Sequence, residues 1–314
     1  MGTDHLLGVL RSLRLRSAVL WGAHLTGRWG VHTDGLTGEV MMFHGVVEGR
    51  AFVRRDADGR AVTLEAGDVI VLPRADAHAV TSEAGGHTVP ITQLPRRPQG
   101  KLSTLDYGTR GDVTRILCGT FELDHPAQQS VVSLLPGALV GSAGSPAART
   151  WAQATLGLMR EELEREGPTA RTTSLADALL AHVLGEVAKR EDAPSSGLLA
   201  AARDEQIGRA LALVHADPSR DWSAADLAAK VGMSRTRFFD RFTELVGEPP
   251  ARYIARWRVH AAADLLRRGT LSMLEVAEKV GYSSEDALAR AFKRHVGVAP
   301  GEYRRTALGG ARAN

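Results

Sequence analysis

The sequence lacks the features that mark exported or membrane proteins. Its single cysteine, Cys118, cannot form an intramolecular disulfide, which excludes the disulfide framework of small secreted domains. No apolar run approaches the roughly 20 residues of a membrane-spanning helix. The first residues, from Met1 to His5, carry an acid early and lack a basic-then-apolar signal pattern. We therefore expect a cytoplasmic protein without a membrane partner.

The chain is too long for one ordinary core. With 314 residues, of which 44% are hydrophobic and 24% charged, it has the composition of a soluble globular protein with two domains. The basic residues are concentrated near the end of the chain. Residues 204–314 hold 18 Lys and Arg against 14 Asp and Glu, whereas residues 1–203 hold 21 against 22. This excess is a weak indication of nucleic-acid binding, because a solvated basic surface looks the same.

The first half of the sequence is rich in predicted strands. After a short amphipathic helix expected over residues 5–16, brief apolar runs alternate with Gly-rich turns up to about residue 135. Residues 53–62 contain Asp-Gly between two such runs, which predicts a hairpin. Many short strands with evenly spaced turns favour an antiparallel sandwich or barrel. Helical periodicity follows over 151–165 and 174–190, and residues 191–203, with Pro194 and Gly197, read as a linker.

The last third of the sequence repeats itself. Residues 227–234 parallel residues 276–283 at an offset of 49, and the downstream aromatic, Gly and Pro positions repeat at an offset of 50. Each copy contains a short helix, a turn with a glycine, and a second helix that begins after a serine. This pattern is a helix-turn-helix written twice. Ser223 and Ser272 are expected to cap the first helices, and Gly232 and Gly281 suit the positive φ of a tight helix exit.

The second helix of each copy predicts a surface for DNA. Phe238 and Phe242 face inward in copy one, as Leu288 and Phe292 do in copy two. The opposite face in copy one is expected to carry Phe239 as well as polar residues. Polar and charged side chains on and beside the opposite faces are the candidate DNA-binding residues. They are Arg235, Thr236, Arg237, Asp240 and Thr243 in copy one, and Glu285, Asp286, Arg290, Lys293 and Arg294 in copy two. One long helix over 249–268 is expected to hold the two readers about one DNA turn, roughly 34 Å, apart.

The segment from about Asp204 to Tyr303 resembles the DNA-binding domain of AraC/XylS-type bacterial transcription regulators, with both copies and the connecting helix present. The resemblance implies a regulator, either an activator or a repressor, that binds promoter DNA as a homodimer and contacts RNA polymerase. The acidic Asp240, Glu285 and Asp286 depart from the basic or amide residues usual in the family. Acidic side chains can accept a hydrogen bond from cytosine N4 but repel phosphate.

Residues 4–190 resemble the cupin-like sensor domain of such regulators. The supporting residues include Arg28-Trp29-Gly30 and the run from Leu64 to Pro73 that leads to His78, with Ala75 where the motif usually has Gly. Cupin enzymes bind a metal, and His44, Glu48 and His78 formally supply two His and a carboxylate, although Met42 stands where another His is usual. A cupin-type metal-dependent enzyme with an appended helical domain is therefore the alternative function.

A structural zinc site is the second hypothesis for the barrel interior. His44, His78 and Cys118, with His125 as a fourth ligand, lie on separate predicted segments and have the ligand types of Zn²⁺. Alternatively, the histidines are hydrogen-bonded core residues and Cys118 is a small buried residue. A redox role for Cys118 would need an exposed thiol of lowered pKa.

Together these patterns predict an α+β protein of two domains: a cupin-like antiparallel β-barrel followed by helices, and an all-α double helix-turn-helix. The expected boundaries are a sensor domain over 1–150, a helical dimerisation segment over 151–191, a linker over 192–203 and a DNA-binding domain over 204–306. The predicted function is sequence-specific transcription regulation in response to a small effector or a metal or redox signal. Effector binding would change how the sensor restrains or pairs the DNA-binding domains.

Overall fold

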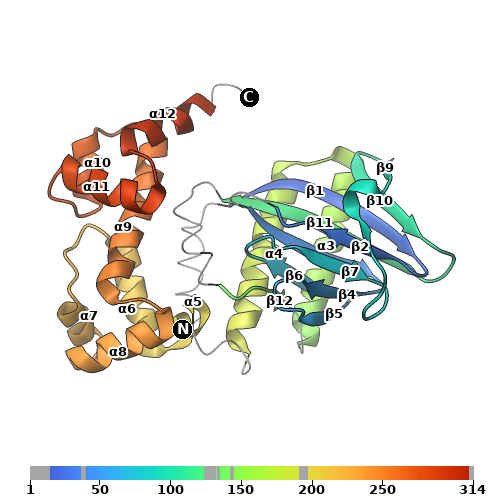
Figure 1. Ribbon diagram of the computed structural model, residues 1–314, viewed down its shortest axis with the longest axis horizontal. Helices are drawn as coiled ribbons and strands as arrows, with labels where there is room; N and C mark the ends of the chain where they lie inside the picture. The colour runs from blue at the N-terminus through green and yellow to red at the C-terminus, as the bar shows by residue number, and fades with distance from the viewer. Residues whose placement is uncertain are drawn as a thin grey trace. The chain divides into compact units, whose positions relative to one another are not determined.

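The computed structural model describes residues 15–36, 40–123, 132, 135–141, 145–190 and 197–310. These form two compact units, one built mainly from residues 15–123 and 136–190 and the other from 197–310 (Figure 1). The first is rich in strands and the second is helical, which confirms the predicted fold class. The helix expected over 5–16 and the fourth zinc ligand His125 lie outside the described residues, except that Leu15 and Arg16 belong to a strand.

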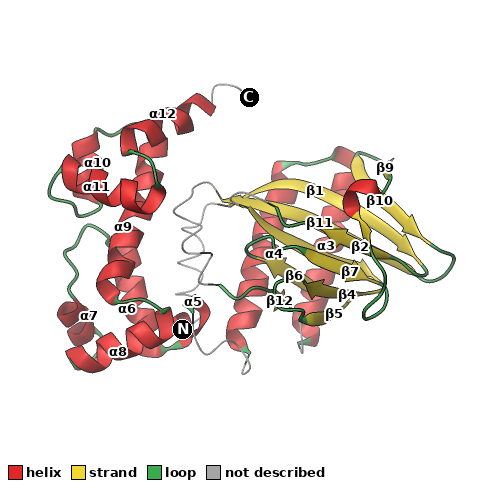
Figure 2. Ribbon diagram, in the orientation of Figure 1, coloured by secondary structure: helices red, strands yellow, loops and turns green. Residues whose placement is uncertain are grey.

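Two sheets make up the core of the first unit (Figure 2). The seven-stranded sheet has the order β12-β6-β3-β11-β1-β10-β9, and the five-stranded sheet has the order β5-β4-β7-β2-β8. The strands in chain order are β1 Leu15–Thr26, β2 Gly30–Thr33, β3 Val40–Glu48, β4 Arg50–Arg55, β5 Ala61–Glu65, β6 Val69–Leu72, β7 His78–Thr81, β8 Val89–Pro90, β9 Arg96–Gln99, β10 Leu102–Gly108, β11 Val113–Leu123 and β12 Leu139–Gly141. A short 3₁₀ turn, η1 Ile91–Gln93, follows β8.

The sheets match the predicted strands, with one topological difference. The hairpin expected over 53–62 is formed by β4 and β5, with Gly59 at a φ of 65° in its turn. Most neighbouring strands are antiparallel, as predicted. However, β1 pairs with β10 and β2 pairs with β8 in parallel. Long connections join both parallel pairs, and the sequence carries no short-range signal for such pairings.

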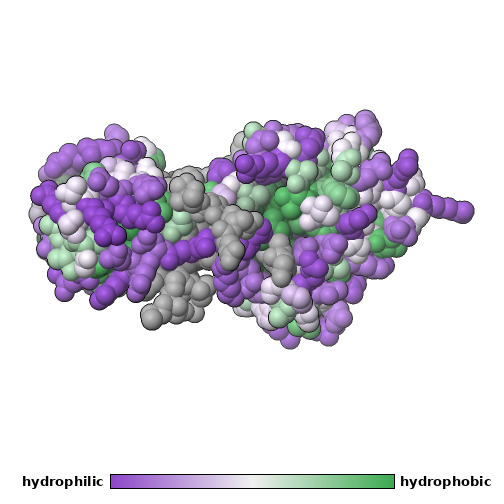
Figure 3. Space-filling view, turned by 90° about the horizontal axis from the view of Figure 1, so that it is seen from below, coloured by the Kyte–Doolittle hydropathy of each residue, from purple (hydrophilic) through white to green (hydrophobic). Residues whose placement is uncertain are grey.

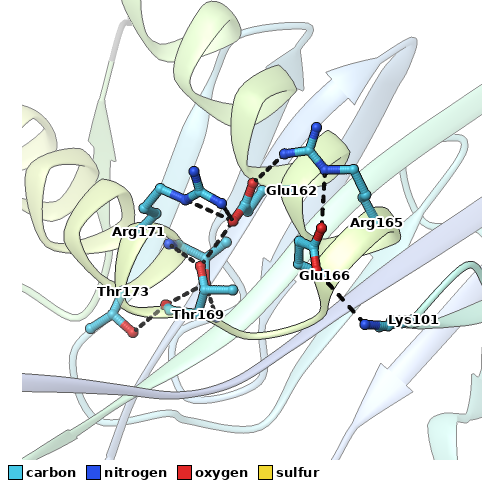
Figure 4. A network of polar contacts seen from close by, with 8 residues as sticks. Lys101, Glu162, Arg165, Glu166, Thr169, Arg171 and Thr173 are labelled. Carbon is cyan, nitrogen blue, oxygen red and sulfur yellow. Dashed lines mark hydrogen bonds and ion pairs between the residues drawn. The ribbon is translucent and has the colours of Figure 1, made fainter.

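Two helices pack on the seven-stranded sheet. Helix α3, Pro146–Glu166, contacts β3, and α4, Ala170–Lys189, contacts β12 and β1. Ser145 caps α3 and Thr169 caps α4. The turn between them is fixed by Glu162, which accepts hydrogen bonds from Thr169, Arg165 and Arg171 (Figure 4). Within the described residues, no helix is long and apolar enough to cross a membrane.

The second unit consists of helices α5 to α12. They are α5 Leu198–Arg203, α6 Glu205–Ala216, α7 Ala224–Lys230, α8 Arg235–Val246, α9 Pro250–Arg268, α10 Met273–Lys279, α11 Glu285–Val296 and α12 Pro300–Gly310. Most surface atoms on the face of this unit seen in Figure 3 are hydrophilic, whereas the visible face of the β-rich unit shows a band of hydrophobic residues.

The structure differs from the linker prediction in its second half. Residues 198–203 form α5, which contacts α6 and α8 and so belongs to the helical unit rather than to a flexible connection. Gly197, just before α5, donates its backbone N–H to the carbonyl oxygen of Leu245 in α8. The small apolar residues Ala200 and Ala201 account for this packing, since both are buried. Residues 191–196 of the predicted linker lie outside the described residues.

Candidate DNA-binding surface and barrel cavity

The caps and turns of the two helix-turn-helix copies are the predicted ones. Ser223 and Ser272 each form a capping box at the start of α7 and α10. Ser234 caps α8, and Ser284 caps α11. The second copy therefore starts its second helix one residue later, which accounts for the change of offset from 49 to 50. Both second helices thus begin where a side-chain oxygen satisfies a free backbone N–H.

Helix α8 exposes one face and buries the other. Phe238 and Phe242 are buried, and their rings lie 5.5 Å apart. The predicted DNA-binding residues of this copy are on the exposed side: Arg235, Thr236, Arg237 and Asp240 are exposed, and Thr243 is half-buried with its hydroxyl donating to the carbonyl oxygen of Phe239.

The candidate set predicted from sequence omits Phe239, which is 44% exposed on the same side of α8. A large aromatic side chain left in water at this position is unusual among the described residues. The helical spacing that turns Phe238 and Phe242 inward also predicted the outward position of Phe239, although the residue was not counted among the DNA-binding candidates.

Helix α11 repeats this arrangement with a stronger contrast between faces. Leu288 and Phe292 are fully buried. Its predicted residues are all exposed, namely Glu285, Asp286, Arg290, Lys293 and Arg294. Glu285 and Asp286 occupy the first turn, where negative charge interacts favourably with the helix dipole. These two acids therefore have a structural reason to be there that does not depend on DNA.

The basic side chains on the two exposed faces are available to an outside partner. Within the described part of the chain, no acidic side chain forms an ion pair with any of five cations, Arg235, Arg237, Arg290, Lys293 and Arg294. By contrast, Arg241 on the edge of α8 is held by Asp204 at 3.1 Å and by Glu244 at 3.0 Å. The surface thus separates unpaired cations from cations used within the fold.

Helix α9 contacts the helices of both copies and holds them together. Its half-way residue Arg258 donates to three backbone carbonyl oxygens: that of Pro218 at 3.0 Å, Arg220 at 2.8 Å and Gly281 at 2.9 Å. Pro218 and Arg220 precede the first copy, and Gly281 is in the turn of the second. One half-buried guanidinium therefore fixes the second turn against the segment that leads into the first copy.

In the β-rich unit, a row of side chains crosses the seven-stranded sheet. Trp21 on β1 pairs with Cys118 on β11, and Cys118 pairs with His44 on β3. These side chains border a small cavity of about 30 Å³. Its lining is mostly apolar and consists of Trp21, Ala23, Leu25, Trp29, Val31, Thr33, His44, Val80, Ile91, Leu105, Ile116 and Cys118.

The structure brings the three predicted zinc ligands together as a hydrogen-bonded chain. His44 Nδ1 lies 3.0 Å from Cys118 Sγ, and His44 Nε2 lies 2.8 Å from His78 Nε2. His78 Nδ1 lies 2.8 Å from the carbonyl oxygen of Asp76, which can only accept a hydrogen bond. With His78 Nδ1 as donor, neutral His78 accepts at Nε2, His44 donates from Nε2, and Cys118 donates its thiol proton to His44 Nδ1.

Burial keeps each member of this chain uncharged. Desolvation lowers the pKa of His44 well below its ordinary value, and the neighbouring His78 lowers it further. Burial also lowers the pKa of His78 and raises the pKa of Cys118 to about 12. The two nitrogens of His44 face different partners, so the three groups do not point at one centre. Within the described residues, no group of three or more His, Cys, Asp or Glu side chains has an arrangement that could hold a metal ion. Zinc at this place stays a prediction.

The structure contradicts the metal-binding role that the enzyme alternative gave to Glu48. Glu48 ends β3 and is exposed, where it is paired with Arg115, whereas His44 and His78 are buried. Glu48 is exposed because the last residues of β3 emerge from the core. The predicted set of two His and a carboxylate is therefore not assembled.

Comparison with known proteins agrees with this arrangement. A family model described as Cupin matches residues 4–188, and a model described as a helix-turn-helix domain matches residues 227–306. A putative AraC-like transcription regulator from Streptomyces antibioticus is 32% identical over 96% of this chain and 98% of its own length. A second, from Streptomyces lividans, is 33% identical with the same coverage. The HTH-type transcriptional regulator AlkR from Acinetobacter baylyi is 27% identical over 96% of this chain and 99% of its own. These relatives are named as regulators and not as enzymes, which supports the regulator interpretation over the enzyme alternative.

Proposed function

Because the chain belongs to the AraC-type transcription regulators with an N-terminal cupin domain, we propose that α8 and α11 read promoter DNA with their exposed faces. The observation that carries this proposal is a set of five cations on those two helices that form no ion pair with any residue the structure describes. A cation that has no ion pair to give up gains the most binding free energy from contacts with DNA phosphates and guanine edges.

The two helices are expected to read different bases. Arg290 lies in the middle of the exposed face of α11 and is suited to a bidentate contact with guanine. On α8, Asp240 is suited to accept from cytosine N4, and the exposed ring of Phe239 is suited to pack on a thymine methyl group. Arg235 and Arg237 in the first turn of α8, and Lys293 on α11, are assigned to phosphates.

Selection of bound sequences from a random duplex library tests this proposal. We expect two recognition elements about one helical turn, roughly 10–10.5 base pairs, apart, and an affinity that falls steeply with salt. Arg290→Ala should lose preference at one base pair, whereas Arg241→Ala, whose cation is already paired with Asp204 and Glu244, should not. Binding without any sequence preference, in the intact protein and in both variants alike, would refute the proposal.

We also propose that the chain forms a homodimer through α3. Trp151 is 41% exposed and Leu158 57% exposed, and their spacing of seven places them on one face of this helix. The ring of Trp151 also packs on the ring of His182 in α4, with 4.4 Å between the centroids, and this contact holds the exposed indole in place. Sedimentation of the full-length chain and of Leu158→Glu tests this, because a dimer built on this face would dissociate in the variant.

The cupin unit is proposed to sense a small effector in the cavity between its sheets and to pass the change to α3. His44 on β3 borders the cavity, and the next residue, Gly45, faces the other way. A Cβ at Gly45 would lie 2.5 Å from the side chain of Leu156 on α3, so strand and helix are in close contact. A shift of β3 would therefore move α3. We further propose that the protein acts in the cytoplasm and activates transcription through contact with RNA polymerase, as the family resemblance implies.

A further inference from the structure

Helix α6 is fastened to the first helix-turn-helix copy at its N-terminal end. Asp204 caps α6, and its carboxylate also accepts a hydrogen bond from Nε of Arg241 in α8 at 3.1 Å. Gln206, in the first turn of α6, donates its side-chain amide to the carbonyl oxygen of Val231, at the end of α7, at 2.9 Å. The two contacts reach both helices of the copy. The start of α6 therefore holds α8 and the turn that precedes it.

The contact between Asp204 and Arg241 is specific to the first copy. At the offset of 50, the residue of α11 that corresponds to Arg241 is Ala291, which has no charge to pair. The turn of the second copy is held instead by Arg258 of α9, which donates to the carbonyl oxygen of Gly281 at 2.9 Å. The two recognition helices therefore depend on different elements: α6 holds α8, and α9 holds the turn that leads into α11.

The C-terminal end of α6 is fastened to α9. His215, in the last turn of α6, has its Nε2 atom 2.7 Å from the hydroxyl oxygen of Tyr253. Its ring also stacks on the ring of Trp257, with 3.7 Å between the centroids. Both aromatic partners belong to α9 and are buried. Because α6 has 12 residues, its two fastened ends lie about 18 Å apart, and one helix connects α8 with α9.

The chain that leaves α6 continues this connection to the second copy. The carboxylate of Asp217 accepts a hydrogen bond from the backbone N–H of Arg220 at 3.2 Å, which closes the exit from α6 into a turn. Arg258 donates to two carbonyl oxygens of this turn and to that of Gly281. A continuous set of polar contacts thus runs from α8 through α6 to the turn before α11.

We infer that α6 sets the distance and orientation between α8 and α11, with Asp204 and Gln206 as the residues that position α8. The inference rests on the proposed reading of DNA by these two helices. It goes further because it assigns the spacing of the two recognition elements to side chains outside the reading faces. One base pair added between the elements turns one against the other by roughly 35°, which a firmly held pair of helices cannot follow.

Double electron–electron resonance on the full-length protein measures this role without DNA. Nitroxide labels at Thr236→Cys and Asp286→Cys, both exposed positions, report the distance between α8 and α11, while the native Cys118 is buried. Asp204→Asn keeps the capping oxygen and loses the charge, and Gln206→Ala removes the second contact. We expect a narrow distance distribution in the labelled protein and a wider one once both changes are added.

Glu244→Gln is the matched control. Glu244 is the other carboxylate that pairs with Arg241, at 3.0 Å, but it lies on α8 itself and does not join this helix to α6. The distance distribution of this variant should therefore stay narrow. A general response to the loss of one ion pair at Arg241 would widen it as much as the double change does.

Spacing selectivity on DNA is the second readout. On the selected duplex with one base pair added between the two elements, the unchanged protein should lose affinity roughly tenfold. The protein with Asp204→Asn and Gln206→Ala should lose no more than about threefold. Its base preference within each element should remain that of the unchanged protein, because no reading side chain is altered.

Two outcomes would overturn the inference: a distribution that stays narrow in the double variant or widens equally in Glu244→Gln, and a spacing penalty that the double variant keeps in full. The first decides the role of α6 whether or not the protein reads DNA as proposed. A protein with the expected label distances but no sequence preference on any duplex would overturn the proposed function alone.

Discussion

Two glycines in equivalent turns of the repeat are predicted to respond very differently to alanine. Gly232 and Gly281 both have positive φ values, 71° and 83°. Alanine in this region costs about 1–2 kcal/mol, and the reduced entropy of the unfolded chain returns about 0.4–1 kcal/mol. No atom lies within 4 Å of a Cβ added at Gly232. Gly232→Ala should therefore lower the free energy of unfolding by only about 1 kcal/mol.

The surroundings of Gly281 add a second cost. A Cβ there would lie 2.7 Å from the carbonyl oxygen of Ser219 and 2.9 Å from Cζ of Arg258. The guanidinium of Arg258 makes three hydrogen bonds to backbone carbonyls, and a hydrogen bond from a charged donor contributes about 1.5–3 kcal/mol. Displacing Arg258 weakens at least one of them. We expect Gly281→Ala to cost about 3 kcal/mol in total.

Urea-dependent hydrogen exchange of the full-length chain, read on peptides from α9 and α11, measures both variants in the unit concerned. With a denaturant slope of about 1–3 kcal/mol per molar, the extra 2 kcal/mol or so should lower the midpoint of Gly281→Ala by about 1 M relative to Gly232→Ala. Equal midpoints would show that Arg258 does not hold the second turn, and the coupling of the two copies through α9 would lose its physical basis.

Three other predictions concern single side chains. Arg290→Ala should weaken binding to the selected duplex by about 1–3 kcal/mol with a change at one base pair, while Lys293→Ala should lower the salt slope by about 1 without changing preference; the reverse pattern in a binding assay would exchange the two roles. Burial lowers the pKa of His215 to about 3, so the folded state binds its proton less well than the unfolded chain, whose value is near 6.5. Stability should then fall as the pH drops below 6.5, and His215→Phe should flatten this loss by up to about 1.4 kcal/mol per pH unit; an unchanged pH profile of urea midpoints would contradict it. With the pKa of Cys118 raised to about 12, its thiol should resist alkylation at pH 8 until the chain unfolds, whereas stoichiometric zinc in chelator-free protein, lost in Cys118→Ala, would replace the hydrogen-bonded chain by a metal site.

The helical unit was predictable because its signals are local. A capping serine, a glycine at the helix exit and the spacing of buried side chains all act within a few residues, and each occurs twice. The repeat itself supports the interpretation, since one copy checks the other. Helix α5 escaped prediction for the same reason. Its six residues carry too little periodicity to stand out after Pro194 and Gly197, and the buried Ala201 is stabilised by contacts with α6 and α8 that local sequence does not show.

The β-rich unit was predictable only in outline. Strand positions follow from alternating apolar residues, but pairing and register depend on residues far apart in the chain. His44 and Cys118 are 74 residues apart, and His44 and His78 are 34 apart and come from different sheets. The sequence therefore suggested that these groups converge without showing that they form a directed chain of hydrogen bonds. One local feature of this unit could be read from the motif. Ala75 stands where the motif usually has glycine, and its φ of 46° keeps the left-handed backbone conformation of that position.

Because side chains alternate along β3, this strand borders the cavity with one face and contacts α3 with the other. His44 belongs to the wall of the cavity, while Gly45 on the other face of the same strand admits Leu156 of α3 so closely that a Cβ would lie 2.5 Å away. Close-packed interiors transmit small displacements because they contain no space to absorb them. The same helix exposes Trp151 and Leu158, the proposed dimer face. A molecule that displaces the His44 side of β3 would therefore act on the proposed dimer face through one strand and one helix, with Gly45 at the point of contact.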